Sequence, residues 1–348
     1  MLRRAFAFCL LATPLAAQSG SRSPAIDSLL SLQSVGSPAL SPDGQRVAYL
    51  VTATDWAHDA FVAQLWVQDL RTGKAQQLTR HESGVGQIQW SPDGDWLAFT
   101  STRVESRSQI FAIALDGGEP VRLTNVAGGV SAYVDWGARG VYFGASQHTA
   151  SHLFVVDPST GAVTRVTGPD SAMLSGFSLS HDQSSAAFTL VTPSTLPEVA
   201  VSPLSSFAPH VVTLMSTQIR EWKLGTREVV RWKSRDGTEI EGILVKPRDF
   251  DPAKKYPLLC VIHGGPTAID RPVLSDARYY PVDEWVNRGA LVLKVNYRGS
   301  AGYGERFRAL NYRNLGVGDA WDVLSGVDAL IANGLRTRCE DADADPAR

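Results

Sequence analysis

The sequence has few cysteines and no concentration of charge of one sign. Its 348 residues include 3 cysteines, whose spacing fits neither a metal site nor a disulfide framework. Lys and Arg nearly balance Asp and Glu, the net charge is −2, and no basic block is present. Nucleic acid and anionic membrane surfaces are therefore not predicted as partners, because both select clustered positive charge. No cofactor is predicted.

Histidine is sparse too, and only His148 and His152 have a spacing that could suit a metal. They would need a helix to share one face, whereas their Ser-, Thr- and Ala-rich setting between predicted strands indicates a loop. We therefore predict no metal site. Of the cysteines, Cys9 lies in the first segment, Cys339 lies in a polar tail, and Cys260 is predicted to be a small core residue.

No long apolar run suggests a membrane span. Residues 1–17 begin with Arg3 and Arg4, continue with an apolar stretch and end in Ala16 and Ala17. This is the layout of a secretory signal peptide cleaved near Ala17, and its apolar part is shorter than the roughly 20 residues that cross a bilayer. An uncleaved anchor is the alternative. We expect a secreted or periplasmic protein without a membrane span after cleavage.

Residues 25–225 repeat a pattern of turn, strand, turn and strand. Ser-Pro-Asp-Gly turns occur at 41–44 and 91–94, and related turns occur at 135–140 and 179–183. Proline presets such a turn, and Asp-Gly supplies a polar cap and a positive φ. The pattern predicts a β-propeller with at least four blade-like units, and leaves open a degenerate fifth over 196–225. A β-sandwich is the alternative.

Two tryptophans occupy equivalent positions in this repeat. Trp90 and Trp136 each stand at the end of a predicted strand, beside a turn. Large aromatic side chains there are predicted to pack between blades rather than to bind a ligand.

Residues 228–334 change to an alternation of strands and helices. The segment 229–247 around Asp236-Gly237 predicts a hairpin. The apolar run 258–262 predicts a central strand of a parallel sheet, covered on both faces. A helix from Val282 to Gly289, a strand over 290–297 and a helix over 319–334, with Leu324 in its apolar stripe, complete a parallel αβ pattern.

The apolar run 258–262 breaks into His263-Gly264-Gly265-Pro266. Two glycines let backbone N–H groups face a cavity without a Cβ in the way, as an oxyanion-binding loop requires. The alternative is a tight strand-to-helix turn with no chemistry.

Six short motifs of this second part together resemble the prolyl oligopeptidase family of serine peptidases, particularly its acylaminoacyl-peptidase and dipeptidyl-peptidase-like branch. They are Asp236-Gly237, Lys255-Tyr-Pro257, His263-Gly-Gly-Pro266, Asn296-Tyr-Arg-Gly-Ser300, Gly302-Tyr-Gly304 and Gly318-Asp-Ala-Trp-Asp322. The resemblance implies a β-propeller, usually with more blades, followed by an α/β-hydrolase domain that cleaves a peptide substrate. By motif match Gly265 would be an oxyanion-hole donor, with His263 and Gly264 as supporting loop residues.

The nucleophile motif G-x-S-x-G of such hydrolases is absent. Ser178, Ser300 and Ser325 do not stand in that pattern, and His263 precedes the place of the nucleophile, whereas the catalytic histidine follows it. None of the catalytic triad is therefore identified, and 335–348 form an aberrant polar tail. We interpret the chain as an incomplete α/β-hydrolase, a fragment inactive alone, with an exposed sheet edge that favours aggregation or partner binding.

Two alternatives remain open. The chain could be one half of a split hydrolase, completed by a complementing chain or within a homo-oligomer, or it could be a non-catalytic periplasmic binding propeller. Residues 25–225 contain no adjacent glutamate pair to hold a substrate amine, which argues against release of dipeptides.

Overall fold

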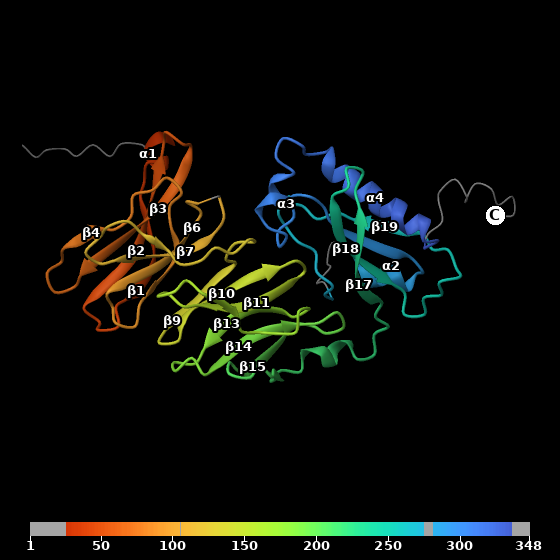
Figure 1. Cartoon of the computed structure of the whole chain (residues 1–348), viewed down its shortest axis with the longest axis horizontal. Coiled ribbons are helices and arrows are strands. Elements are labelled where there is room, and N and C mark those ends of the chain that lie inside the picture. The colour runs from red at the N-terminus through yellow and green to blue at the C-terminus, as the bar shows by residue number, and fades with distance from the viewer. Residues whose placement is uncertain (1–25, 105, 275–280, 336–348) are drawn as a thin grey trace, which may run out of the picture.

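The computed structural model describes residues 26–104, 106–274 and 281–335 (Figure 1). An arc of β-sheet units lies beside a smaller part in which helices cover a sheet. The predicted signal peptide, residues 1–17, and the tail from residue 336 onward lie outside the described residues.

The propeller part contains four successive units of four strands each, and a parallel contact between β11 and β13 joins the third and fourth units into one eight-stranded sheet. α1 (Ile26–Leu30) precedes them and the 3₁₀ helix η1 (Met215–Ile219) follows them. The units consist of β1 (Ser34–Leu40), β2 (Arg46–Asp55), β3 (Ala60–Asp69) and β4 (Ala75–Gln77); β5 (Gly86–Trp90), β6 (Trp96–Ser101), β7 (Gln109–Ala114) and β8 (Val121–Arg122); β9 (Ala132–Gly137), β10 (Gly140–Gln147), β11 (Ala150–Val156) and β12 (Val163–Arg165); and β13 (Met173–Leu179), β14 (Ser185–Val191), β15 (Glu198–Pro203) and β16 (His210–Val211).

The region 196–225 does not form a fifth unit. β15 pairs antiparallel with β14, and β16 pairs with β15, so these strands complete the fourth unit. The degenerate fifth repeat that the sequence left open is not formed, because the alternating burial of β15 fits it between β14 and β16 in the sheet of the fourth unit.

The repeated turns have the predicted conformation. Gly44 and Gly94 adopt φ values of 69° and 76°, and Gln183 takes the equivalent position in the fourth unit at 52°. Trp90 is buried, and its indole N–H donates to the carbonyl of Ala39 in the first unit at 2.9 Å. This confirms the predicted packing between blades.

The apolar cores join each propeller unit to the next one. One cluster links the first two units, a second links units two and three, and a third links units three and four. Trp136 packs against the second of these clusters, as predicted. Figure 1 shows the units arranged as an open arc.

The second part is built on a mixed four-stranded sheet in the order β17-β18-β20-β19. β19 and β20 are parallel, whereas β18 runs antiparallel to both β17 and β20. The sheet is therefore not purely parallel, since the predicted hairpin contributes to it. Its elements are β17 (Thr226–Lys233), β18 (Glu239–Lys246), β19 (Leu258–Val261), α2 (Val282–Asn287), β20 (Leu291–Asn296), α3 (Glu305–Ala309) and α4 (Gly318–Ala332).

Helices cover both faces of this sheet at β20. Leu291, Leu293 and Val295 share a core with Leu330 of α4, whereas Val292 packs with Val286 of α2 on the other face. Successive side chains of a strand point to opposite faces, so β20 is the covered strand.

β19 lies at the edge of the sheet, which corrects the prediction of a central strand covered on both faces. Among the described residues it pairs only with β20, and Leu259 is 39% exposed. Cys260 is exposed rather than in the core. An apolar run predicts that a strand forms, but it does not predict which strands lie beside it.

The apolar stripe predicted for α4 is also corrected at one position. Leu324 is 49% exposed, while Asp322, Gly326 and Leu330 form the buried face. Gly326 permits this packing, because a Cβ there would lie 2.7 Å from the Trp232 ring.

Candidate active site

The loop of His263 to Pro266 follows β19 at its carboxyl end. The His263 ring stacks on Tyr297 with 4.6 Å between centroids, and the Tyr297 hydroxyl donates to the His263 carbonyl at 2.7 Å. Gly265 has a φ of 121°, and a Cβ there would lie 3.0 Å from the backbone nitrogens of Thr267 and Ala268. Glycine is therefore required at 265, while Gly264 and Gly265 remain exposed.

His263 contacts a serine of a distant motif. Its Nε2 lies 3.0 Å from Oγ of Ser300, which is fully buried and donates its own proton to the Tyr297 carbonyl at 2.7 Å. Nδ1 of His263 lies 3.1 Å from the Gly264 carbonyl, and no carboxylate contact of the ring is present among the described residues. This pair therefore fixes the loop and lacks the acid that orients a catalytic histidine. The sequence places both residues in motifs but does not show their contact.

Arg298 joins three of the motifs in a buried ion cluster. Its Nε and Nη2 donate to the two carboxylate oxygens of Asp322 at 3.0 and 2.7 Å, and Nη1 donates to Asp236 at 2.8 Å. The hydrogen bonds to Asp322, with those to Asp236, raise the pKa of Arg298, and Arg298 lowers the pKa of Asp236. The cluster ties the hairpin turn to the start of α4 and to the loop that carries Ser300.

Asn296, at the end of β20, holds the segment after the glycine loop. Its side-chain amide donates to the Asp270 carbonyl at 2.8 Å and accepts from the Asp270 N–H at 2.7 Å. It also donates to the Tyr303 hydroxyl at 3.0 Å, which itself donates to Glu241 at 2.8 Å. Burial, followed by the charge of Glu241, raises the pKa of Tyr303. These bonds hold the chain at Asp270, seven residues after His263.

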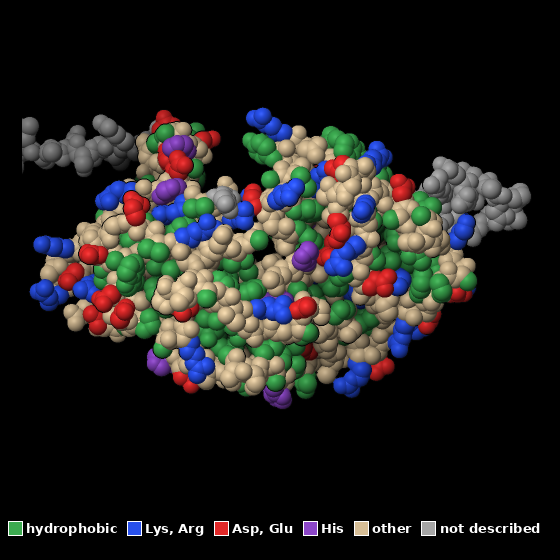
Figure 2. Space-filling view, viewed as in Figure 1, with side chains coloured by type: hydrophobic (Ala, Val, Ile, Leu, Met, Phe, Trp, Pro, Cys, Tyr) green, Lys and Arg blue, Asp and Glu red, His purple; other side chains and the backbone are tan. Residues whose placement is uncertain are grey.

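The glycine loops face the propeller. The His148 N–H, at the tip of the β10–β11 hairpin, donates to the Gly302 carbonyl at 2.9 Å. A cavity of about 250 Å³ lies between the two parts, lined by 106–108 and 127–130 on one side and by Thr267 and 300–302 on the other. Figure 2 shows a hollow between the first blades and the second part. The Gly265 loop therefore adjoins a space shared with the propeller.

The remaining candidate residues do not come together. Ser178 lies on β13 and Ser325 lies on α4. His148 is in the turn of a hairpin, as predicted, whereas His152 is buried on strand β11 rather than in the predicted loop. Within the described ranges no group of three or more His, Cys, Asp or Glu could hold a metal ion.

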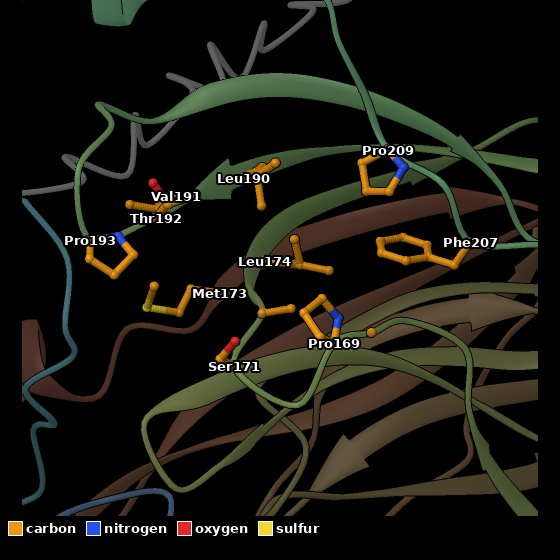
Figure 3. A pocket seen from close by; sticks show the side chains of 12 residues that line it. Pro169, Ser171, Met173, Leu174, Leu190, Val191, Thr192, Pro193, Phe207 and Pro209 are labelled. Carbon is orange, nitrogen blue, oxygen red and sulfur yellow. The ribbon is translucent and has the colours of Figure 1, made fainter. Parts of the chain in front are cut away.

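A larger pocket lies within the propeller, away from the Gly265 loop. It has a volume of about 490 Å³, and Figure 3 shows Pro169, Pro193, Pro209 and Phe207 around it. None of its lining residues is titratable, so it offers shape and apolar surface but no acid or base. In the part of the chain that the structure describes, no helix is long and apolar enough to cross a membrane.

The comparisons with known proteins agree with this architecture. Residues 28–214 match the TolB beta propeller domain, and residues 279–340 match the Prolyl oligopeptidase family. Dipeptidyl-peptidase 5 of Porphyromonas gingivalis is 24% identical over 298 residues, which cover 84% of this chain and 36% of that protein. The uncharacterized peptidase YuxL of Bacillus subtilis is 33% identical over 105 residues, covering 30% of this chain and 16% of that protein.

A solved structure shows the same fold. The crystal structure of puromycin hydrolase superposes with a TM-score of 0.66 at 23% identity, covering 88% of this chain and 48% of that one. The chain thus spans less than half the length of these relatives. By the match over residues 28–214 the chain belongs to the proteins with a TolB beta propeller domain, and the propeller is followed by a region that matches part of the Prolyl oligopeptidase family.

Proposed function

We propose that this chain supplies the propeller and the first half of the catalytic domain of a secreted or periplasmic serine-type peptidase for oligopeptides or acylaminoacyl peptides. The observation that carries the proposal is the Gly265 loop, at the carboxyl end of β19 and beside a cavity that the propeller also lines. In αβ proteins, ligands bind beside the carboxyl ends of the parallel strands, and the Gly265 loop lies at such an end. In this division residues 1–17 are the signal peptide, 25–225 the propeller and 228–334 the catalytic part.

In this function the loop stabilises charge in the transition state. The N–H of Gly265 donates to the oxyanion that forms when a serine attacks the peptide carbonyl, and a second N–H after the nucleophile completes the hole. The propeller restricts the size of peptides that reach the loop. Because residues 1–348 contain no G-x-S-x-G motif, we propose that this polypeptide alone does not hydrolyse peptides.

The proposal is tested by assaying the purified chain with N-acetyl-aminoacyl and prolyl chromogenic peptides and by labelling it with a fluorophosphonate. We expect neither turnover nor a labelled serine. Hydrolysis that the fluorophosphonate abolishes would contradict the proposal. The S300A variant is the matched control, because Ser300 is the serine that touches His263. Labelling lost in S300A would identify Ser300 as a nucleophile.

A further inference from the structure

A second cavity lies on the seam between the propeller and the catalytic part. It has a volume of about 460 Å³ and is lined by strands of the third and fourth propeller units and by Arg271, Val273 and Leu274. It shares no lining residue with the cavity at Ser300. Its polar lining includes Arg271, His152 and Ser146, and none of the described lining residues is Asp or Glu.

Arg271 is a largely buried cation with a neutral partner. Its Nη2 donates to Oγ of Ser146 at 2.9 Å, and its Nε has no hydrogen-bond partner among the described residues. Burial lowers the pKa of Arg271, and no carboxylate of the described residues counteracts this. By contrast, Arg298 contacts Asp322 at 2.7 Å. A buried cation without a counter-charge is costly, so an anion that enters this cavity is stabilised.

His152 provides a second donor. It is fully buried, lines the same cavity, and its Nδ1 lies 3.2 Å from Oγ1 of Thr167. That hydroxyl accepts the Leu153 N–H at 3.1 Å, which leaves its own proton for Nδ1. The ring proton is then on Nε2, which has no hydrogen-bond partner in the part of the chain that the structure describes. Burial, followed by the charge of Arg165, lowers the pKa of His152, and the smaller effects of Asp170 oppose this shift.

We propose that this cavity binds the carboxylate of a peptide, with Arg271 as the cationic donor and the His152 Nε2–H as the second donor. The peptide character of the ligand rests on the proposed function, because the cavity lies on the same seam as the Gly265 loop. Met173, Phe177 and Leu274 line the cavity and supply apolar surface for the neighbouring side chain. The carboxylate belongs either to the peptide C-terminus or to an acidic side chain.

Calorimetric binding to the full chain tests this proposal without any catalytic activity. The probes are acetyl-trialanine with a free carboxylate, the same peptide as its amide, and acetyl-Ala-Asp-Ala amide. We expect at least one carboxylate peptide to bind about tenfold more tightly than the amide, as a charge-assisted hydrogen bond predicts. The free acid alone would identify a C-terminal site, and the Asp peptide alone would identify an acidic side-chain site.

R271Q should abolish the preference for the carboxylate peptide over the amide. R306Q is the matched control, because it removes the same charge from an exposed arginine. Circular dichroism checks that both variants fold, and R271K should retain part of the preference. Equal binding of the three peptides overturns the proposal, as does a preference that survives R271Q or falls equally in R306Q. None of these outcomes bears on the fluorophosphonate assay.

Discussion

Gly302 is required both by its backbone conformation and by the closeness of the propeller. Its φ is 90°, and a Cβ there would lie 2.5 Å from the His148 carbonyl oxygen. We expect G302A to lower the free energy of unfolding by about 1–3 kcal/mol from backbone strain, and further because of the clash with His148. A lower urea midpoint measures this loss. The control is G316A, with φ 79° and no atom within 4 Å of the added Cβ. Equal losses of stability in G302A and G316A would show that the close contact with the propeller does not require glycine at 302.

Arg298 is a residue whose loss leaves buried charge behind. Asp322 is fully buried and receives bonds from the backbone and side chain of Arg298. R298Q should therefore cost about 3–5 kcal/mol, as removal of one partner of a buried pair does. The matched control is R288Q, which breaks an exposed i, i+4 pair with Glu284 and should cost at most about 0.5 kcal/mol. Similar urea midpoints for the two variants would contradict a structural role for the cluster.

At the scale of elements, Glu198 connects β15 to the segment that leads out of the propeller. Its carboxylate accepts hydrogen bonds from the Ser216 N–H and hydroxyl, both at 2.6 Å, and from the Met215 N–H and the Thr213 hydroxyl. The Ser216 hydroxyl, followed by that of Thr213, lowers the pKa of Glu198 to about 2. A depressed carboxyl pKa stabilises the fold above the unfolded value and loses that stabilisation as the pH falls through the folded value.

We therefore expect E198Q to be less stable than the wild type at pH 6. The difference should shrink as the pH falls from about 4.5 toward 2, because the wild-type carboxylate then takes up a proton. Urea unfolding of both proteins at pH 6 and pH 3 measures it. E221Q is the control at an exposed glutamate. A difference between wild type and E198Q that does not change with pH would refute the assignment.

The sequence predicted which turns, strands and helices form better than it predicted which of them pack together. The Ser-Pro-Asp-Gly turns and the Asp236-Gly237 hairpin follow from local chemistry, and the structure has them where expected. The position of β19 at an edge and the burial of Asp322 instead of Leu324 depend on which strands and side chains lie alongside, which periodicity does not encode. The same holds for the His263–Ser300 contact and for Arg271 on the propeller seam.

At the scale of the whole molecule, the two parts meet through glycine loops and a few polar contacts. The His148–Gly302 and Arg271–Ser146 bonds bring the β10–β11 hairpin against the loop after β20 and the segment after β19. The proposed oxyanion donor and the proposed carboxylate site therefore depend on the same seam. A change that separates the two parts should weaken both, even where each part stays folded.

The open side of the catalytic part gives the molecule an apolar surface around β19 and α4. Leu259 is 39% exposed and Leu324 is 49% exposed, and in the described part of the chain β19 pairs with β20 alone, at the end of the sheet. Such an edge pairs readily with a second copy. We expect the chain to sediment as concentration-dependent oligomers, and L259K combined with L324K to shift it toward monomer. V121K, at a 53% exposed position on β8, is the control. A wild-type chain that is monomeric at every concentration would rule out this interface. A shift toward monomer in V121K as large as in the L259K and L324K double variant would also rule it out.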